Sequence, residues 1–367
     1  MRRRTAIAVA AILTIGAPLA LSACSSESVN ANPAVASAEQ LGGLPASFTG
    51  ERASIQAVTA VSATETGLAV ATIADGQARL TVASPSGVTL WSAPLPGEAD
   101  AIYGTREAEA SWVSVRVGPR LLVFNASSVG SLVKPLHSLD VGTERLVATS
   151  SRLLLVDSQA LVNSREGTLT RVKLTRDERA IAGTSTAVLL ASGETLVGLR
   201  SDRGGWLAAE HVPEGAQADS RAKVLAQGSG VVVAQWGDRV AAHRLLDGVI
   251  LATASVPGGV EGGTIIAADA SSVAVGGQVL DLASGTSAPL PEGFAAASAF
   301  EGLIYGESAN GPSVVDAATG QPMAGVAPSL IPEEFTPWRS GLLFKESSEN
   351  GTVGVDIAPL RPLDTPR

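Results

Sequence analysis

Seven glycines recur at nearly regular intervals along this 367-residue chain, and each stands between two short apolar segments. They are Gly87, Gly130, Gly167, Gly205, Gly248, Gly285 and Gly320. The successive intervals are 43, 37, 38, 43, 37 and 35 residues, with a mean of about 39. A fixed period of this length indicates one supersecondary unit that is repeated in series.

Each period contains four short apolar segments bounded by Gly, Pro, Asp or Ser, as in "KVLAQG", "GVVVAQWGD" and "AAHRLLDGVILATASVP". Segments of five to eight residues without a 3.6-residue period predict strands. Four strands in about 39 residues match the size of one blade of a β-propeller. The sequence therefore predicts an all-β β-propeller over residues 46–367.

The last period offers only three strands, "EEFTPWRS", "GLLFKESS" and "GTVGVDIAPLRP". We expect the N-terminal segment "ASFTG", residues 46–50, to supply the missing outer strand of this last blade. Such closure leaves no long open sheet edge. Seven complete units and this shared one predict eight blades. Seven blades is the alternative if the weak third unit, "LLLVDSQALVNSREG", merges with a neighbour.

The motif Asp-x-x-Ser/Thr-Gly occurs twice in the same phase, as Asp281 to Gly285 and as Asp316 to Gly320. An Asp side chain can accept backbone N–H bonds within a turn, and Gly supplies the positive φ that closes a short hairpin. We interpret Asp281, Gly285, Asp316 and Gly320 as structural turn residues between the third and fourth strands. Their repetition in phase argues against a catalytic role for the two carboxylates.

The chain begins with three arginines, an apolar run and small residues, which is the layout of a secretory signal peptide over residues 1–23. The sequence "LSAC" ending at Cys24 resembles the lipobox of bacterial lipoproteins, and Cys24 is the only cysteine. The resemblance implies cleavage before Cys24 and acylation of this residue, and two or three acyl chains anchor a protein stably. Residues 24–45 are predicted to form a flexible tether. The expected location is the outer face of the cytoplasmic membrane.

The chain is acidic, with a formal net charge of −9. Removal of residues 1–23 takes away three arginines and no acid, so the mature chain carries about −12. An acidic body argues against nucleic acid and against docking on anionic lipid headgroups. Arginine outnumbers lysine, and Ala, Gly and Val are abundant, which is typical of GC-rich coding as in actinobacteria.

The turn motif, followed by Trp or an apolar residue as in "SGVTLWSAPLP", resembles the PQQ-like, quinoprotein-type propeller repeat over roughly residues 46–362. This superfamily includes PQQ-dependent dehydrogenases and cofactor-free lipoprotein scaffolds. The dehydrogenases usually carry a vicinal Cys-Cys disulfide and a Trp docking motif in most blades. This sequence has one cysteine, and we find no common phase among its five tryptophans. The resemblance therefore implies the cofactor-free branch, and no cofactor is expected.

Other motifs for chemistry are lacking. His137, His211 and His243 are far apart in the sequence and are predicted to lie in separate strands, so no metal site is expected. Small residues such as Ala226, Ala268 and Ala297 recur on the predicted inner strands, where they either pack the crowded axis or line an open channel.

The predicted function is a non-catalytic, lipid-anchored scaffold that recognises another envelope protein through its loop face. The alternative is a propeller enzyme, a quinoprotein dehydrogenase or a hydrolase that uses the channel mouth.

Overall fold

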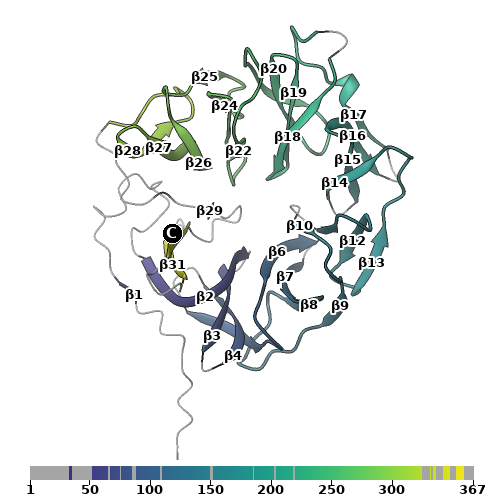
Figure 1. Ribbon diagram of the computed structural model, residues 1–367, viewed down its shortest axis with the longest axis vertical. Helices are drawn as coiled ribbons and strands as arrows, with labels where there is room; N and C mark the ends of the chain where they lie inside the picture. The colour runs from purple at the N-terminus through teal and green to yellow at the C-terminus, as the bar shows by residue number, and fades with distance from the viewer. Residues whose placement is uncertain are drawn as a thin grey trace, which may run out of the picture.

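The fold is an all-β propeller, as the sequence predicts. The computed structural model describes residues 33–34, 52–64, 67–74, 76–84, 88–107, 110–148, 152–184, 186–201, 204–217, 220–324, 331, 334–335, 342–347 and 353–358. Groups of antiparallel strands stand around a common axis, with the first strand of each group nearest the axis (Figure 1). In the described part of the chain the one helical turn is η2, a 3₁₀ turn at Ala208–Glu210.

The described strands form six sheets, and two of these sheets each join two successive groups of strands, so we divide the strands into eight units along the chain. The first unit contains β2 (Arg52–Thr64), β3 (Gly67–Ala74), β4 (Gln77–Ala83) and β5 (Thr89–Pro94), and the second contains β6 (Ala101–Glu107), β7 (Ala110–Val117), β8 (Arg120–Asn125) and β9 (His137–Asp140). The third unit contains β10 (Leu146–Ala148), β11 (Leu153–Leu155), β12 (Ala160–Asn163) and β13 (Thr168–Arg171). The fourth contains β14 (Arg179–Gly183), β15 (Ala187–Ser192), β16 (Thr195–Ser201) and β17 (Gly204–Leu207).

The fifth unit contains β18 (Lys223–Gly228), β19 (Val231–Trp236), β20 (Arg239–Arg244) and β21 (Ile250–Ser255), and the sixth contains β22 (Ile265–Ile266), β23 (Ser272–Val275), β24 (Gln278–Asp281) and β25 (Ser287–Pro289). The seventh unit contains β26 (Ala295–Phe300), β27 (Leu303–Ser308) and β28 (Gly311–Asp316). The eighth contains β29 (Glu334–Phe335), β30 (Leu342–Ser347) and β31 (Val353–Ala358). A short strand, β1 (Pro33–Ala34), pairs with β2. Here we number these units as blades one to eight.

The third unit forms a sheet of its own, in the order β10-β11-β12-β13. It does not merge with a neighbouring blade, which was the reason for the seven-bladed alternative. The grouping of the described strands is therefore compatible with the eight blades that the sequence predicts.

The ring is closed by the long strand β2. Its first half pairs with β31 of the last blade, from Ala53 opposite Ile357 to Val58 opposite Val353. Its second half is the inner strand of the first blade and pairs with β3. The expected closing segment, residues 46–50, lies outside the described residues, and the closing strand of the structure begins at Arg52.

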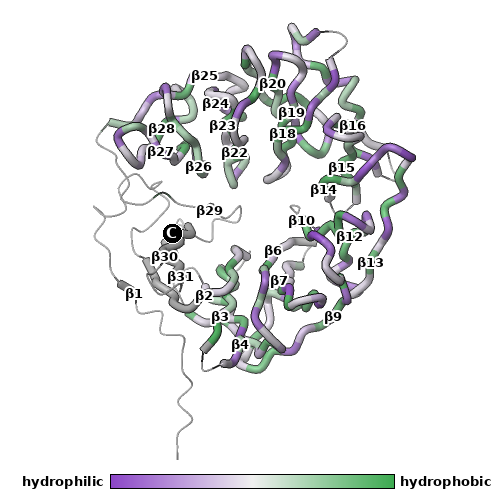
Figure 2. Tube along the Cα trace, viewed as in Figure 1, coloured by the Kyte–Doolittle hydropathy of each residue, from purple (hydrophilic) through white to green (hydrophobic). Residues whose placement is uncertain are grey.

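The core consists of apolar layers between adjacent blades. Trp91 of the first blade packs with Phe124 of the second, and Val240 of the fifth packs in one cluster with Leu280 of the sixth. Because a blade has a neighbour on each face, middle strands such as β19 are buried almost throughout instead of alternating between buried and exposed residues. Hydrophobic segments accordingly recur in blade after blade around the ring (Figure 2).

Candidate functional site: a pocket on the channel wall

Asp281 and Gly285 close the turn between β24 and β25. The Asp281 carboxylate accepts hydrogen bonds from the N–H of Ala283 at 2.9 Å and of Ser284 at 3.3 Å, and from the Ser284 hydroxyl at 2.8 Å. Gly285 has a φ of +76°, and its N–H donates to the Asp281 carbonyl at 2.9 Å. Partial burial raises the pKa of Asp281, but the bonds from Ser284 and Ala283 lower it more, so that the pKa lies below its ordinary value.

Asp316 and Gly320 form the equivalent turn after β28. The Asp316 carboxylate accepts hydrogen bonds from the N–H of Thr319 at 2.9 Å and from its hydroxyl at 3.0 Å. Gly320 has a φ of +68° and donates its N–H to the Asp316 carbonyl at 2.8 Å. Both carboxylates are therefore engaged by the backbone and hydroxyl groups of their own turns, which makes them unsuited to proton transfer with a substrate.

These turn glycines have a second role that the sequence does not reveal, because each one contacts the outer strand of the preceding blade. A Cβ on Gly320 would collide with the carbonyl oxygen of Pro289, which ends β25. A Cβ on Gly248 would lie 2.6 Å from the Trp206 ring in β17, and one on Gly285 would lie 3.2 Å from the Leu251 carbonyl oxygen in β21. The repeated glycine thus permits close packing between blades as well as a positive φ.

Two of the five tryptophans, Trp91 and Trp206, occupy equivalent places in the structure. Trp91 in β5 donates its indole N–H to the Ala126 carbonyl oxygen of the next blade at 2.8 Å. Trp206 in β17 donates in the same way to the Leu245 carbonyl oxygen at 2.9 Å. Ala126 directly follows β8 and Leu245 directly follows β20, which is the third strand of the next blade in each case. Each of these indoles therefore ties one blade to the next.

Two histidines that are far apart in the sequence contact the same indole in the structure. His243 in β20 stacks on Trp206 with ring centroids 5.9 Å apart, and His211 meets the same indole edge-on at 5.6 Å. His211 follows η2 instead of lying in a strand. The third histidine, His137 in β9, contacts the Arg165 carbonyl oxygen at 3.0 Å in another part of the ring.

The side chain of His243 is fully buried, and this burial favours the uncharged imidazole. Its Nδ1–H donates to the Gly248 carbonyl oxygen at 2.9 Å, and its Nε2 has no hydrogen-bond partner among the described residues. Burial is the main cause that lowers the pKa of His243, and it outweighs the opposing effect of the bond to Gly248. The described residues contain no group of three or more His, Cys, Asp or Glu that could hold a metal ion.

The N-terminal predictions fall outside the described residues. Neither Cys24 nor residues 46–50 belong to the described part of the chain, so lipidation of Cys24 stays a prediction. Within the described part of the chain, none of the helical segments has the length and hydropathy of a membrane span.

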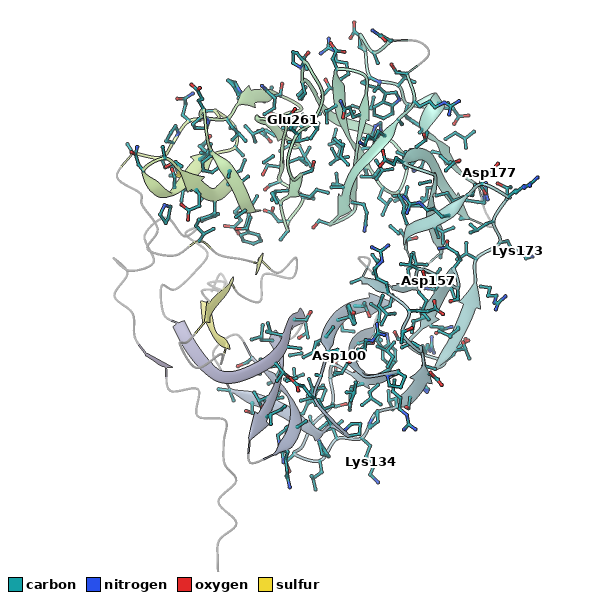
Figure 3. The ribbon with its side chains drawn as sticks, viewed as in Figure 1. Asp100, Lys134, Asp157, Lys173, Asp177 and Glu261 are labelled. Atoms are coloured by element: carbon teal, nitrogen blue, oxygen red, sulfur yellow. The ribbon has the colours of Figure 1, made fainter. Side chains whose placement is uncertain are left out.

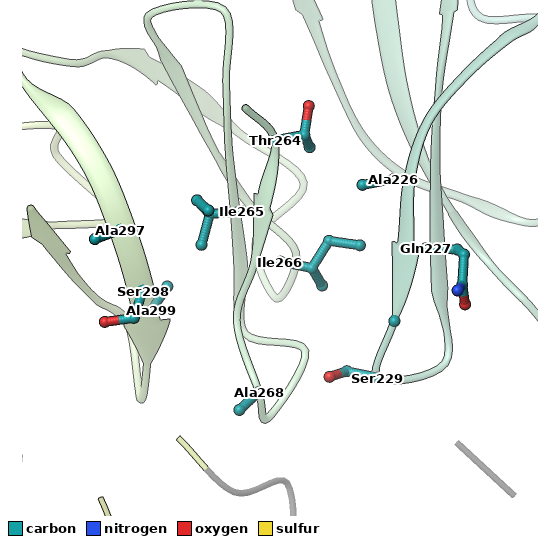
Figure 4. A pocket seen from close by; sticks show the side chains of 11 residues that line it. Ala226, Gln227, Ser229, Thr264, Ile265, Ile266, Ala268, Ala297, Ser298 and Ala299 are labelled. Carbon is teal, nitrogen blue, oxygen red and sulfur yellow. The ribbon is translucent and has the colours of Figure 1, made fainter. Parts of the chain in front are cut away.

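The candidate site is a pocket formed by the inner strands of the fifth, sixth and seventh blades. It has a volume of about 280 Å³. Figure 4 shows Ile265 and Ile266 of β22 between residues of β18 and residues of β26. The lining residues are Ala226, Gln227, Gly228, Ser229, Thr264, Ile265, Ile266, Ala268, Ala297, Ser298 and Ala299.

The small inner-strand residues divide between core packing and the lining of the pocket, and an open channel stays a prediction. Ala267 is fully buried and packs in the layer between the sixth and seventh blades. Ala226, Ala268 and Ala297 instead line the pocket, and their small side chains leave its volume free.

The chemistry of the pocket is that of a binding site for an apolar group. None of its lining side chains is titratable, and the polar ones are a glutamine, two serines and a threonine. Such a wall can bury a hydrocarbon group and orient it with a few hydrogen bonds. It offers neither a general acid nor a general base.

No family model matches the sequence, and no curated protein matches it. Among solved structures, the chain is similar to Saccharomyces cerevisiae Sqt1, with 12% identity, a TM-score of 0.40, and coverage of 84% of this chain and 96% of that one. It is also similar to the C-terminal WD40 domain of Sif2, with 11% identity, a TM-score of 0.48, and coverage of 83% and 96%. The propeller fold itself follows from the strand pairing described above.

Proposed function

We propose that this chain is a non-catalytic propeller that binds another protein of the cell envelope. The observation that carries the proposal is the pocket, whose lining contains no titratable side chain. A site of this composition can hold an apolar group of a partner without acting on it chemically. A rigid ring that presents variable loops suits such a binding role.

The proposal includes export and a lipid anchor on Cys24. It is supported by the sequence before Cys24, in which arginines, an apolar run and small residues precede the only cysteine of the chain. Acyl chains on Cys24 would hold the propeller at the outer face of the cytoplasmic membrane, with residues 24–45 as the tether. The resemblance to the cofactor-free branch of the PQQ-like repeat agrees with a lipoprotein scaffold.

The anchor is tested by Cys24→Ala in the full-length chain expressed in its host. We expect the variant to lose the mass of the acyl chains and to leave the membrane fraction or to stay uncleaved. Ser22→Ala, two residues away, is the matched control and should remain acylated. Membrane attachment of Cys24→Ala that equals the wild type, with no change in mass, would refute the lipoprotein proposal.

The binding function is tested by crosslinking in intact cells, with a photoreactive residue placed at Gln227 on the pocket wall. We expect one envelope protein to be crosslinked at this position and not at Gln217, which lies on the loop before β18. Turnover of a substrate by the purified chain, or a bound cofactor with a visible spectrum, would favour the enzyme alternative and contradict the proposal.

A further inference from the structure

The charge of the propeller is distributed very unevenly around the ring. Residues 58–244, in the first five blades, contain 18 lysines and arginines and 18 aspartates and glutamates, so their charges balance. Residues 245–323 contain eight acidic residues and no lysine, arginine or histidine. We call residues 245–323 the acidic arc. It comprises the end of the fifth blade and the whole of the sixth and seventh.

Five carboxylates of the acidic arc belong to segments next to the inner strands that line the pocket. Glu261 and Glu292 are exposed on the loops that lead into β22 and β26. Glu307 is exposed at the end of β27, opposite Ala295 of β26. At the other ends of the same inner strands stand Asp269, directly after Ala268, and Glu301, directly after Phe300. Figure 3 shows Glu261 near the sixth blade, far around the ring from Lys134 and Lys173.

The pocket itself is apolar and uncharged, although carboxylates lie beyond both of its ends. Ile265 and Ile266 are only half-buried there, and Ala297 is exposed. A volume of about 280 Å³ admits one or two large apolar side chains. An apolar centre inside a charged rim is the usual composition of a protein-binding surface.

We propose that the pocket takes an apolar side chain from a partner segment in which lysine or arginine flanks that side chain. This inference rests on the proposed binding function and specifies its partner. The apolar side chain fills the space between β18, β22 and β26, and the basic neighbours face the carboxylates of the acidic arc. A second copy of this chain fits less well, because its first five blades have no net positive charge that could pair with the acidic arc.

The field of the arc makes the interaction sensitive to salt. Exposed charges separated by more than about 10 Å are screened at 0.1 M ionic strength. Asp247 of the arc pairs with Arg244 at 3.5 Å. The carboxylates of the arc have no basic residue within their own segment, so they act together at low salt and speed the approach of a cation. We therefore expect affinity to fall as salt is added, mainly through slower association.

The probe is a set of three short labelled peptides, measured by fluorescence anisotropy with the purified propeller. The first has a leucine–phenylalanine pair flanked by lysines. The second replaces this pair by serines, and the third replaces the lysines by glutamates. We expect the first peptide to bind at least about tenfold more tightly than either of the others. Equal binding of the first and second peptides, or tighter binding of the third, would overturn the inference.

Matched variants locate the binding. The triple variant Glu261→Gln, Glu292→Gln, Glu307→Gln should lower the affinity for the first peptide about tenfold. The control Glu98→Gln, Glu166→Gln, Glu214→Gln removes the same charge from exposed positions in other blades and should leave binding near the wild-type value. Equal losses in both triple variants would mean that only net charge matters, which contradicts the proposed site.

The pocket is tested separately by Ala297→Phe, which fills it from β26. Ala295→Phe, on the same strand but outside the lining, is the control. We expect Ala297→Phe to abolish binding of the first peptide while both variants keep the wild-type circular dichroism spectrum and melting temperature. Undiminished binding by a folded Ala297→Phe protein would refute the pocket as the binding site.

The crosslinking experiment distinguishes a failure here from a failure of the proposed function. If a partner crosslinks in cells and still binds the Ala297→Phe protein, the proposed binding function is supported, but the inference about the pocket is refuted. Absence of any crosslinked protein, together with binding of all three peptides alike, would remove both.

Discussion

At the scale of single residues, the glycines of the acidic arc separate two physical demands. Gly263 has a φ outside the left-handed region and open space around it, Gly293 has a φ of +74° with open space, and Gly320 has both a positive φ and a backbone contact. Comparison of Gly→Ala at these three positions therefore isolates the cost of φ from the cost of the contact.

We expect Gly263→Ala to leave the free energy of unfolding unchanged or slightly higher, since alanine restricts the unfolded chain. Gly293→Ala should lower it by about 1 kcal/mol because its φ is unfavourable for an L-residue. Gly320→Ala should lower it by about 2 kcal/mol or more, since a collision with Pro289 is added. Urea denaturation measures all three, and similar values at the three positions would contradict this explanation.

His243 makes the stability of the propeller depend on pH near neutrality. Its pKa is lowered in the folded state, so in the window below the unfolded value of about 6.5 the unfolded chain binds a proton that the folded chain does not. The stability contributed by neutral His243 is complete above that value and is lost as the pH falls through this window.

The prediction is a difference between wild type and His243→Asn. The variant loses packing on Trp206, so its free energy of unfolding at pH 8 is lower than that of the wild type. The difference between the two free energies of unfolding, which we call the gap, should shrink as the pH falls from about 7 to about 5. Urea denaturation at a series of pH values gives the gap directly. A gap that stays constant over this range would show that His243 is not the titrating group.

At the scale of the elements, the outer strands are fastened by tryptophans. We expect Trp206→Phe to lower the free energy of unfolding by about 1 to 3 kcal/mol, because the buried Leu245 carbonyl oxygen loses its donor while most of the apolar contact remains. Trp91→Phe should have a similar effect through Ala126. Trp112→Phe is the comparison, since the Trp112 indole nitrogen has no hydrogen-bond partner among the described residues. Equal losses at Trp112 and Trp206 would mean that the bond between blades contributes little.

The sequence predicts the elements better than the contacts between them. The spaced glycines and the short apolar segments were sufficient for the strands, because turn chemistry and strand propensity act locally. The equivalence of Trp91 and Trp206 could not be found in this way, since three residues separate Gly87 from Trp91 but Gly205 directly precedes Trp206. Pairing in register with the third strand, and not distance from the glycine, sets the position of each indole.

The site was the hardest part to predict from the sequence. Its lining comes from three inner strands in separate blades, and most of its residues are alanine, isoleucine or serine, which also pack ordinary cores. The meeting of His211 and His243 on Trp206 likewise depends on how two blades pack. The absence of basic residues from 245 to 323 was visible in the sequence, but it acquires a meaning only once those residues form one side of a ring.

At the scale of the whole molecule, closure by β2 predicts a sharp boundary for truncation. A chain that starts at residue 51 loses the two-residue strand β1 but keeps the strand that pairs with β31, so we expect its melting temperature to be close to that of a chain that starts at residue 25. A chain that starts at residue 59 loses that strand and exposes the edge of the last blade, so we expect a lower melting temperature and aggregation. Differential scanning calorimetry measures the melting temperatures and light scattering the aggregation. Equal melting of all three chains would mean that the ring is not held by this pairing.

The same pairing also sets the order of events when the chain folds. Most blades complete themselves from neighbouring residues, but Ala53 meets Ile357 only after almost the entire chain has been made. Contacts between residues so far apart in sequence form late and slowly. The first half of β2 is therefore synthesised before the blades and is among the last segments to find its partner. The time during which it stays unpaired is when the chain is most exposed to misassociation.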